Sequence, residues 1–128
     1  MKRLYVSYSY ENSNFYYLLK SQVQEIGLEI VCADIEPVNS TNEKIIKKML
    51  IKEINKASMV LTFIPSYSNW VEWELRTARE LGIPILGVSV GGNEKKAPKI
   101  ISDLEITIID WTFDSLVSAL KSEGNCLY

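Results

Sequence analysis

The chain has 128 residues, a length that suits one domain with its own core and is too short for two. Hydrophobic residues make up 47% and charged residues 23%, and a net charge of −2 without a basic patch argues against nucleic-acid binding. Histidine is absent, which excludes Ser-His-Asp and Cys-His catalysis and a histidine-ligated zinc ion.

The sequence predicts a cytoplasmic protein that contacts no membrane. No apolar run approaches the roughly 20 residues that cross a bilayer. The N-terminal sequence, residues 1–8, lacks the apolar h-region of a signal peptide. Cys32 and Cys126 do not form a disulfide framework, and we expect neither a metal ion nor a cofactor.

The first half of the chain alternates short β-rich runs with longer amphipathic runs. The predicted elements are a strand over residues 3–8, a helix capped by Asn12 or Ser13 and closed by Gly27, a strand over residues 28–33, a loop over residues 34–39 and a helix over residues 40–57. Residues 40–43 have the spacing of a capping box. The expected core face of the first helix consists of Phe15, Leu18, Leu19, Val23 and Ile26.

The second half continues the same alternation. The predicted elements are a strand over residues 58–64, a helix over residues 69–82, a strand over residues 84–90, an exposed loop over residues 91–99, a strand over residues 107–110 and a helix over residues 113–121. This order predicts a single flavodoxin-like, three-layer α/β domain with a parallel five-stranded sheet and helices on both faces. We expect the domain to span residues 1–122, with a tail over residues 123–128.

One carboxylate, Glu74, lies on the apolar stripe of its predicted helix. That stripe gathers Trp70, Trp73, Thr77, Ala78 and Leu81. A core-facing carboxylate costs several kcal/mol unless it is paired, hydrogen-bonded or facing a cavity. The helix follows the carboxyl end of a predicted central strand, and such ends form the ligand-binding edge of parallel sheets. Glu74 is therefore predicted to lie close to a binding site.

A second glutamate, Glu53, also falls on the apolar side of its helix and serves as a comparison. It lies near the C-terminal end of that helix, which returns to the opposite edge of the sheet. We expect its carboxylate to pair with a lysine or to reach solvent. Position at the binding edge, and not burial alone, distinguishes Glu74.

The motifs around these residues resemble a TIR-like domain over roughly residues 2–110. Residues 4–8 resemble the first TIR strand, residues 33–36 the acidic turn after the second strand, and residues 66–75 the segment in which a catalytic glutamate follows a tryptophan by four residues. The chain is most similar to the TIR-like proteins of Thoeris antiphage systems. It departs from the eukaryotic pattern at Lys2-Arg3, where an acidic residue often stands, and in its short loop after the second strand.

The resemblance implies that Glu74 is catalytic and that NAD is the substrate. It further implies a cyclic or conjugated ADP-ribose signal, a separate effector that reads this signal, and self-association on activation. The chemistry is compatible with the absence of histidine, because nicotinamide leaves as a neutral molecule and needs no acid. One carboxylate can then stabilise the oxocarbenium-like ribose, whereas ordinary glycosidases need two.

Further candidate substrate-binding residues are Tyr8, Ser9, Tyr10, Asp34 and Trp70. Each has a structural alternative: partial burial for the first three, a turn for Asp34 and a core anchor for Trp70. Asn69 and Glu72 fit N-cap and N3 positions. Two other functions stay open, a non-catalytic TIR-like interaction module and a nucleoside deoxyribosyltransferase-like enzyme.

Overall fold

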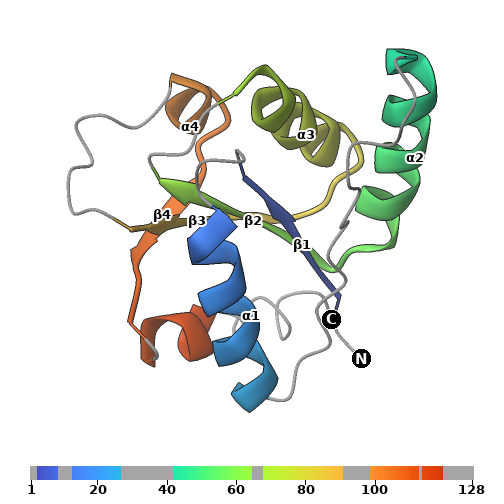
Figure 1. Cartoon of the computed structure of the whole chain (residues 1–128). Coiled ribbons are helices and arrows are strands. Elements are labelled where there is room, and N and C mark those ends of the chain that lie inside the picture. Colours follow the sequence, from blue (N-terminus) through green and yellow to red (C-terminus); the bar gives the residue numbers. More distant parts are fainter. Residues whose placement is uncertain are drawn as a thin grey trace.

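The computed structural model describes residues 3–8, 13–26, 42–64, 68–90, 99–112 and 114–119 (Figure 1). The elements in chain order are β1 (Leu4–Ser7), α1 (Ser13–Ile26), α2 (Glu43–Lys56), β2 (Met59–Ile64), α3 (Asn69–Glu80), β3 (Ile85–Ser89), α4 (Lys99–Asp103) and β4 (Thr107–Asp110), followed by a short helix over residues 114–119. Among the described helices, none is long and apolar enough to cross a membrane.

The four strands form one parallel sheet in the order β1-β2-β3-β4. β2 is buried along its whole length, as its almost unbroken apolar sequence predicts for the centre of a parallel sheet. In the register of the sheet, Ser7 pairs with Thr62, and Thr62 pairs with Gly87. The predicted strand over residues 28–33 lies outside the described residues, so the fifth strand stays a prediction.

Helices cover both faces of this sheet, which confirms the predicted layered α/β fold. Figure 1 shows α1 and the helix over residues 114–119 on one face, and α2, α3 and α4 on the other. Side chains of β1 alternate between the two cores. Leu4 and Val6 pack with α1, whereas Tyr5 packs in the core that contains the apolar residues of α2 and α3. The odd-numbered positions of β1 therefore face α3.

The core face of α1 differs from the prediction. Leu18 is 53% exposed, and Tyr16 is buried in its place together with Leu19 and Val23. The spacing 16, 19 and 23 follows the helical repeat as well as the predicted one. Tyr16 lies in the core because its ring stacks on Tyr8, with the ring centroids 4.9 Å apart. Ring stacking of this kind is not visible in a hydrophobicity pattern.

The N-caps predicted for α2 and α3 were wrong. α2 begins after Asn42, whose side chain accepts a hydrogen bond from the backbone N–H of Lys44, so its N-cap is Asn42 and not Ser40. α3 begins after Ser68, whose Oγ accepts from the N–H of Val71 at 3.1 Å. Asn69 is therefore the first helical residue and not the cap. Serine and asparagine compete closely for capping positions, which explains the small displacement.

The other boundaries are close to those expected, with one addition. α3 ends at Glu80 rather than Gly82, and Gly82 follows in a left-handed conformation with φ of 74°. The N–H of Ile83 donates to the carbonyl of Ala78, which completes a Schellman-type end. The sequence did not predict α4, whose five residues are too few to show a helical repeat.

Candidate functional site

Glu74 is held in the layer between the sheet and α3. Its helix starts beyond the carboxyl end of β2, and Glu74 occupies the second turn. Val71, Leu75 and Ala78 on the same face of α3 are fully buried and fix the helix on the sheet. Glu74 lies on the same face of α3 and is 9% exposed. The sequence prediction that this carboxylate faces the core is therefore confirmed.

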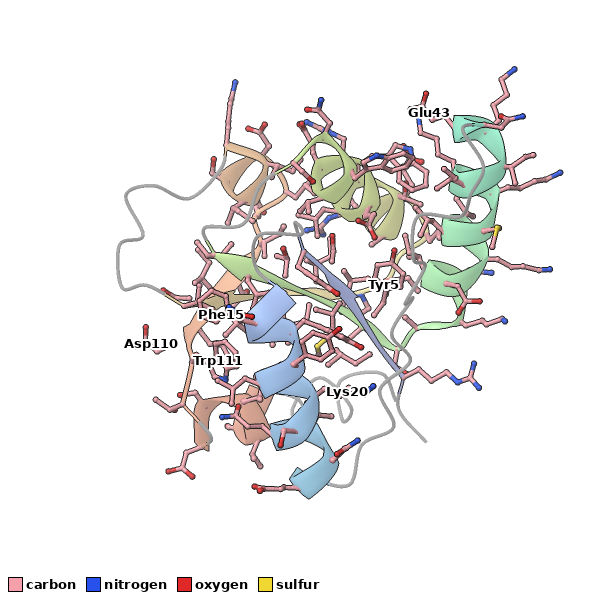
Figure 2. All side chains as sticks on the ribbon, in the orientation of Figure 1. Tyr5, Phe15, Lys20, Glu43, Asp110 and Trp111 are labelled. Carbon is pink, nitrogen blue, oxygen red and sulfur yellow. The ribbon has the colours of Figure 1, made fainter. Side chains whose placement is uncertain are left out.

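Two hydroxyl groups of β1 donate hydrogen bonds to this carboxylate. The Tyr5 hydroxyl donates to Oε2 of Glu74, and Ser7 Oγ donates to Oε1 at 3.3 Å. Tyr5 and Ser7 are two residues apart in an extended strand, so their side chains point to the same face of the sheet. Figure 2 labels Tyr5 in the layer between β1 and the helices α2 and α3. Both carboxylate oxygens thus have a partner, which explains how the buried position is tolerated.

The electrostatics of Glu74 suit acid–base chemistry near neutral pH. Burial raises the pKa of Glu74 from its ordinary value of 4.5 to about 7, against the hydrogen bonds from Tyr5 and Ser7, which lower it. The pKa of Tyr5 is also raised, first by burial and then by the neighbouring Glu74 carboxylate. Tyr5 therefore keeps its proton and remains a hydrogen-bond donor. Perturbed carboxylates of this kind are typical of functional sites.

The surroundings of the Tyr5–Ser7–Glu74 cluster contain further hydroxyl groups. Thr62 lies beside Ser7 in the register of the sheet and is fully buried. Its Oγ1 atom has no hydrogen-bond partner in the described part of the chain. The hydroxyl of Thr77 donates to the carbonyl of Trp73 at 2.8 Å and is thereby satisfied within α3. Thr62 and Thr77 therefore stand near the cluster without bonding to its carboxylate.

Trp70 lies at the start of α3, one helical turn before Glu74. It is 38% exposed, which argues against the alternative that it anchors the core. Its ring meets the ring of Trp73 edge to face, with the centroids 5.8 Å apart. Lys47 of α2 places its Nζ 5.4 Å from the Trp73 ring centroid, a cation–π distance. An open aromatic surface therefore lies on the same helix as the carboxylate.

Of the other sequence-predicted site residues, the structure describes Tyr8, which does not join this cluster. Tyr8 lies on the α1 side of the sheet, stacked on Tyr16 and edge to face with Phe63 at 6.3 Å. The structure thus does not bring Tyr8 together with Glu74. Ser9, Tyr10 and Asp34 lie outside the described residues. Their roles in substrate binding stay predictions.

Sequence reasoning missed Tyr5 and Ser7 as partners of Glu74. A signal for them was present, because both carry hydroxyl groups on one side of a strand whose other side, Leu4 and Val6, is purely apolar. No group of three or more acidic or cysteine side chains among the described residues could hold a metal ion. The site is built from one carboxylate and the hydroxyls around it.

The chain matches one family model and several known folds. Residues 5–95, which include the whole Tyr5–Ser7–Glu74 cluster, match the model described as Thoeris protein ThsB, TIR-like domain. None of the curated proteins is detectably similar in sequence to this chain.

Three solved structures with low sequence identity share the fold. A conserved protein from Enterococcus faecalis V583 is 12% identical over 95% of this chain and 98% of that chain, with a TM-score of 0.71. A 2-deoxyribosyltransferase from Bacillus psychrosaccharolyticus is 15% identical over 90% of each chain, with a TM-score of 0.69. A CMP N-glycosidase from Clostridium botulinum is 15% identical over 94% of this chain and 98% of that chain, with a TM-score of 0.61.

Proposed function

The chain belongs to the family of the TIR-like domain of the Thoeris protein ThsB, and on this premise we propose that it cleaves the nicotinamide–ribose bond of NAD with Glu74 as its catalytic residue. The product is a cyclic or conjugated ADP-ribose signal in antiphage defence. The observation that carries the proposal is a carboxylate that is 9% exposed and accepts hydrogen bonds from two hydroxyls, and burial raises its pKa to about 7.

The main requirement of the reaction is a carboxylate whose negative charge is not screened by water. The bond between nicotinamide and C1′ of ribose breaks with its electron pair leaving on nicotinamide, which departs neutral. Positive charge then develops on the ribose, and an ionised Glu74 stabilises it strongly because the site is buried. A hydroxyl or ring nitrogen of the same or another molecule attacks C1′. Where the attacking group loses a proton, Glu74 can accept it.

The remaining parts of the proposal concern binding and signalling. Trp70, whose ring is partly exposed one turn before Glu74, stacks on a ring of the dinucleotide. Ser9, Tyr10 and Asp34 complete the substrate site at the carboxyl ends of the strands, whereas Tyr8, on the α1 side of the sheet, is not part of it. The enzyme works in the cytoplasm, associates with further copies when it is activated, and passes its product to a separate effector.

Nicotinamide release in infected cells tests this function. Bacteria that express the wild-type chain, Glu74→Gln or Glu53→Gln are infected with phage, and NAD and nicotinamide are measured in extracts over time. We expect NAD loss with wild type and with Glu53→Gln, whose carboxylate is 30% exposed and pairs with Lys56 at 3.6 Å. Glu74→Gln is expected to consume no NAD. Equal consumption by wild type and Glu74→Gln would refute the proposed role.

A second candidate is an enzyme that acts on nucleosides or nucleotides other than NAD. Two structures with this fold are described as a CMP N-glycosidase and a 2-deoxyribosyltransferase, and both names refer to the bond between a base and its sugar. The same carboxylate could serve this chemistry. Incubation of the purified chain with NAD, CMP and deoxynucleosides separates the candidates, because NAD alone is consumed on the favoured proposal.

The third alternative, a non-catalytic interaction module, treats Glu74 as a structural carboxylate. The raised pKa of Glu74 favours a functional role. A purely structural position would be more stable with a neutral side chain, because an ionised carboxylate is costly to bury. On the structural alternative, Glu74→Gln would change stability or assembly and leave NAD levels in infected cells the same as with wild type.

A further inference from the structure

The two oxygens of the Glu74 carboxylate are held unequally. Oε2 accepts a hydrogen bond from the Tyr5 hydroxyl, whereas Oε1 accepts one from Ser7 Oγ at 3.3 Å. Ordinary O–H···O hydrogen bonds are about 2.5–3.0 Å long, so the Ser7 contact is weak. The Tyr5 hydroxyl is therefore the main hydrogen-bond partner of the carboxylate.

Tyr5 is well suited to be the fixed partner. Its side chain is 1% exposed and packs among Ile54, Val60 and Leu75, which belong to three different elements. A ring enclosed in this way has no room to turn its hydroxyl elsewhere. Ser7 is also fully buried, and its contact with Oε1 at 3.3 Å adds a second, weaker constraint on the carboxylate.

Resting on the NAD-cleaving function proposed above, we propose that Tyr5 is a positioning residue that fixes Glu74 through Oε2, so that Oε1 faces the ribose. A glutamate side chain has several rotatable bonds, and a fixed oxygen removes most of this freedom before substrate arrives. Oε1 then meets the positive charge that develops at C1′.

Within the described part of the chain, few groups influence the ionisation of this pair. Burial is the largest influence on Glu74, followed by the hydrogen bonds from Tyr5 and then Ser7. Glu53 of α2 is the further charged group that acts on Tyr5. A Tyr5→Phe substitution removes the stronger of the two hydrogen bonds to Glu74 and keeps the packed ring. The carboxylate then loses a stabilising donor, which raises its pKa.

A titration of Glu74 in the full chain tests the proposal without any need for catalysis. Glutamate carboxyl carbons are labelled with ¹³C, and the Glu74 resonance is assigned by its loss in Glu74→Gln. We expect Tyr5→Phe to raise the Glu74 midpoint by about one pH unit or more, as for loss of a hydrogen bond to a charged group. Ser7→Ala shifts it less. The control Thr62→Val, which removes a buried hydroxyl with no described partner, leaves the midpoint unchanged.

The kinetic arm applies once NAD cleavage is measured. Tyr5→Phe is expected to lower kcat at least tenfold and to move the acid limb of the pH profile upward, while KM changes little, because Tyr5 acts on Glu74 and not on substrate. An unchanged Glu74 midpoint in Tyr5→Phe overturns the inference. If wild type cleaves no NAD, the proposed function fails while the titration still decides the role of Tyr5.

A wild-type measurement covers the case in which Tyr5→Phe does not fold. The ¹³Cζ resonance of labelled Tyr5 reports the electron density at its hydroxyl. We expect it to move with the same midpoint as the Glu74 carboxyl carbon, because the two groups share a hydrogen bond. A Tyr5 resonance that stays constant across the Glu74 titration would contradict the contact and the inference.

Discussion

Replacing Glu74 by glutamine is expected to stabilise the protein at alkaline pH and not at acidic pH. The folded chain holds the pKa of Glu74 at about 7, against 4.5 for an unperturbed glutamate. Between these two values the unfolded chain has lost its proton while the folded chain keeps it. Stability of the wild type therefore falls as the pH rises through this window, and the loss is complete above the folded pKa.

The size of the effect follows from the two pKa values. The difference between 4.5 and about 7 corresponds to about 3 kcal/mol at 1.36 kcal/mol per pKa unit. Roughly 2 to 3 kcal/mol of this falls between pH 5 and pH 8. Glutamine at position 74 does not titrate, so Glu74→Gln should gain this amount relative to wild type over that interval. The other titrating groups largely cancel in the comparison.

Urea unfolding at pH 5 and pH 8, followed by circular dichroism, measures the difference. We expect the urea midpoint of Glu74→Gln to rise relative to wild type by about 1 M more at pH 8 than at pH 5, for a slope near 2 kcal/mol per molar urea. Glu53→Gln serves as the matched control and should show no comparable gain, because its side chain is 30% exposed and paired with Lys56. A Glu74→Gln protein with the same pH dependence as wild type would refute the buried, proton-retaining state of Glu74.

Three further predictions concern the pH profile, a buried hydroxyl and a helix cap. The acid limb of the pH profile of kcat/KM for NAD cleavage is expected near pH 7. The acid limb of kcat is expected at a lower pH, because the cationic nicotinamide ring of bound NAD favours the ionised form of Glu74. Acid limbs of kcat and kcat/KM at the same pH would argue against this. Thr62→Val should be neutral or stabilising by up to about 1 kcal/mol in urea unfolding, and a loss above that would reveal a partner for its hydroxyl. Ser68→Ala should cost about 1 kcal/mol in the same assay, whereas Asn69→Ala should cost less, since Ser68 caps α3; the reverse order would contradict that assignment.

The parts of the fold that the sequence predicted are those with strong local patterns. The apolar run of β2 and the alternation of strands with helices were sufficient for the parallel sheet and its two covered faces. The helical repeat placed Glu74 on the buried side of α3. The finer assignments were wrong where contacts between side chains decide which residue is buried. Tyr16, and not Leu18, lies in the core of α1, where its ring stacks on Tyr8.

The partners of Glu74 depended on information that no local pattern contains. Tyr5 and Glu74 are 69 positions apart, and their contact requires both the face of β1 and the docking of α3 on the sheet. The same geometry assigned Tyr8 to the opposite face, although both residues belong to the same short strand segment. The sequence identifies the buried carboxylate because the apolar pattern of a single helix places it on the core side. It could not name the hydroxyls that hold it.

Mass spectrometry of the products formed from isotopically labelled NAD tests the central claim most directly. Purified chain is activated with extract from phage-infected cells, and nicotinamide and all labelled ADP-ribose compounds are quantified. The account predicts one free nicotinamide for each new cyclic or conjugated ADP-ribose molecule with wild type, and neither product with Glu74→Gln. Labelled NAD that stays intact with wild type in extracts that trigger defence in cells, or equal product formation by Glu74→Gln, would contradict it.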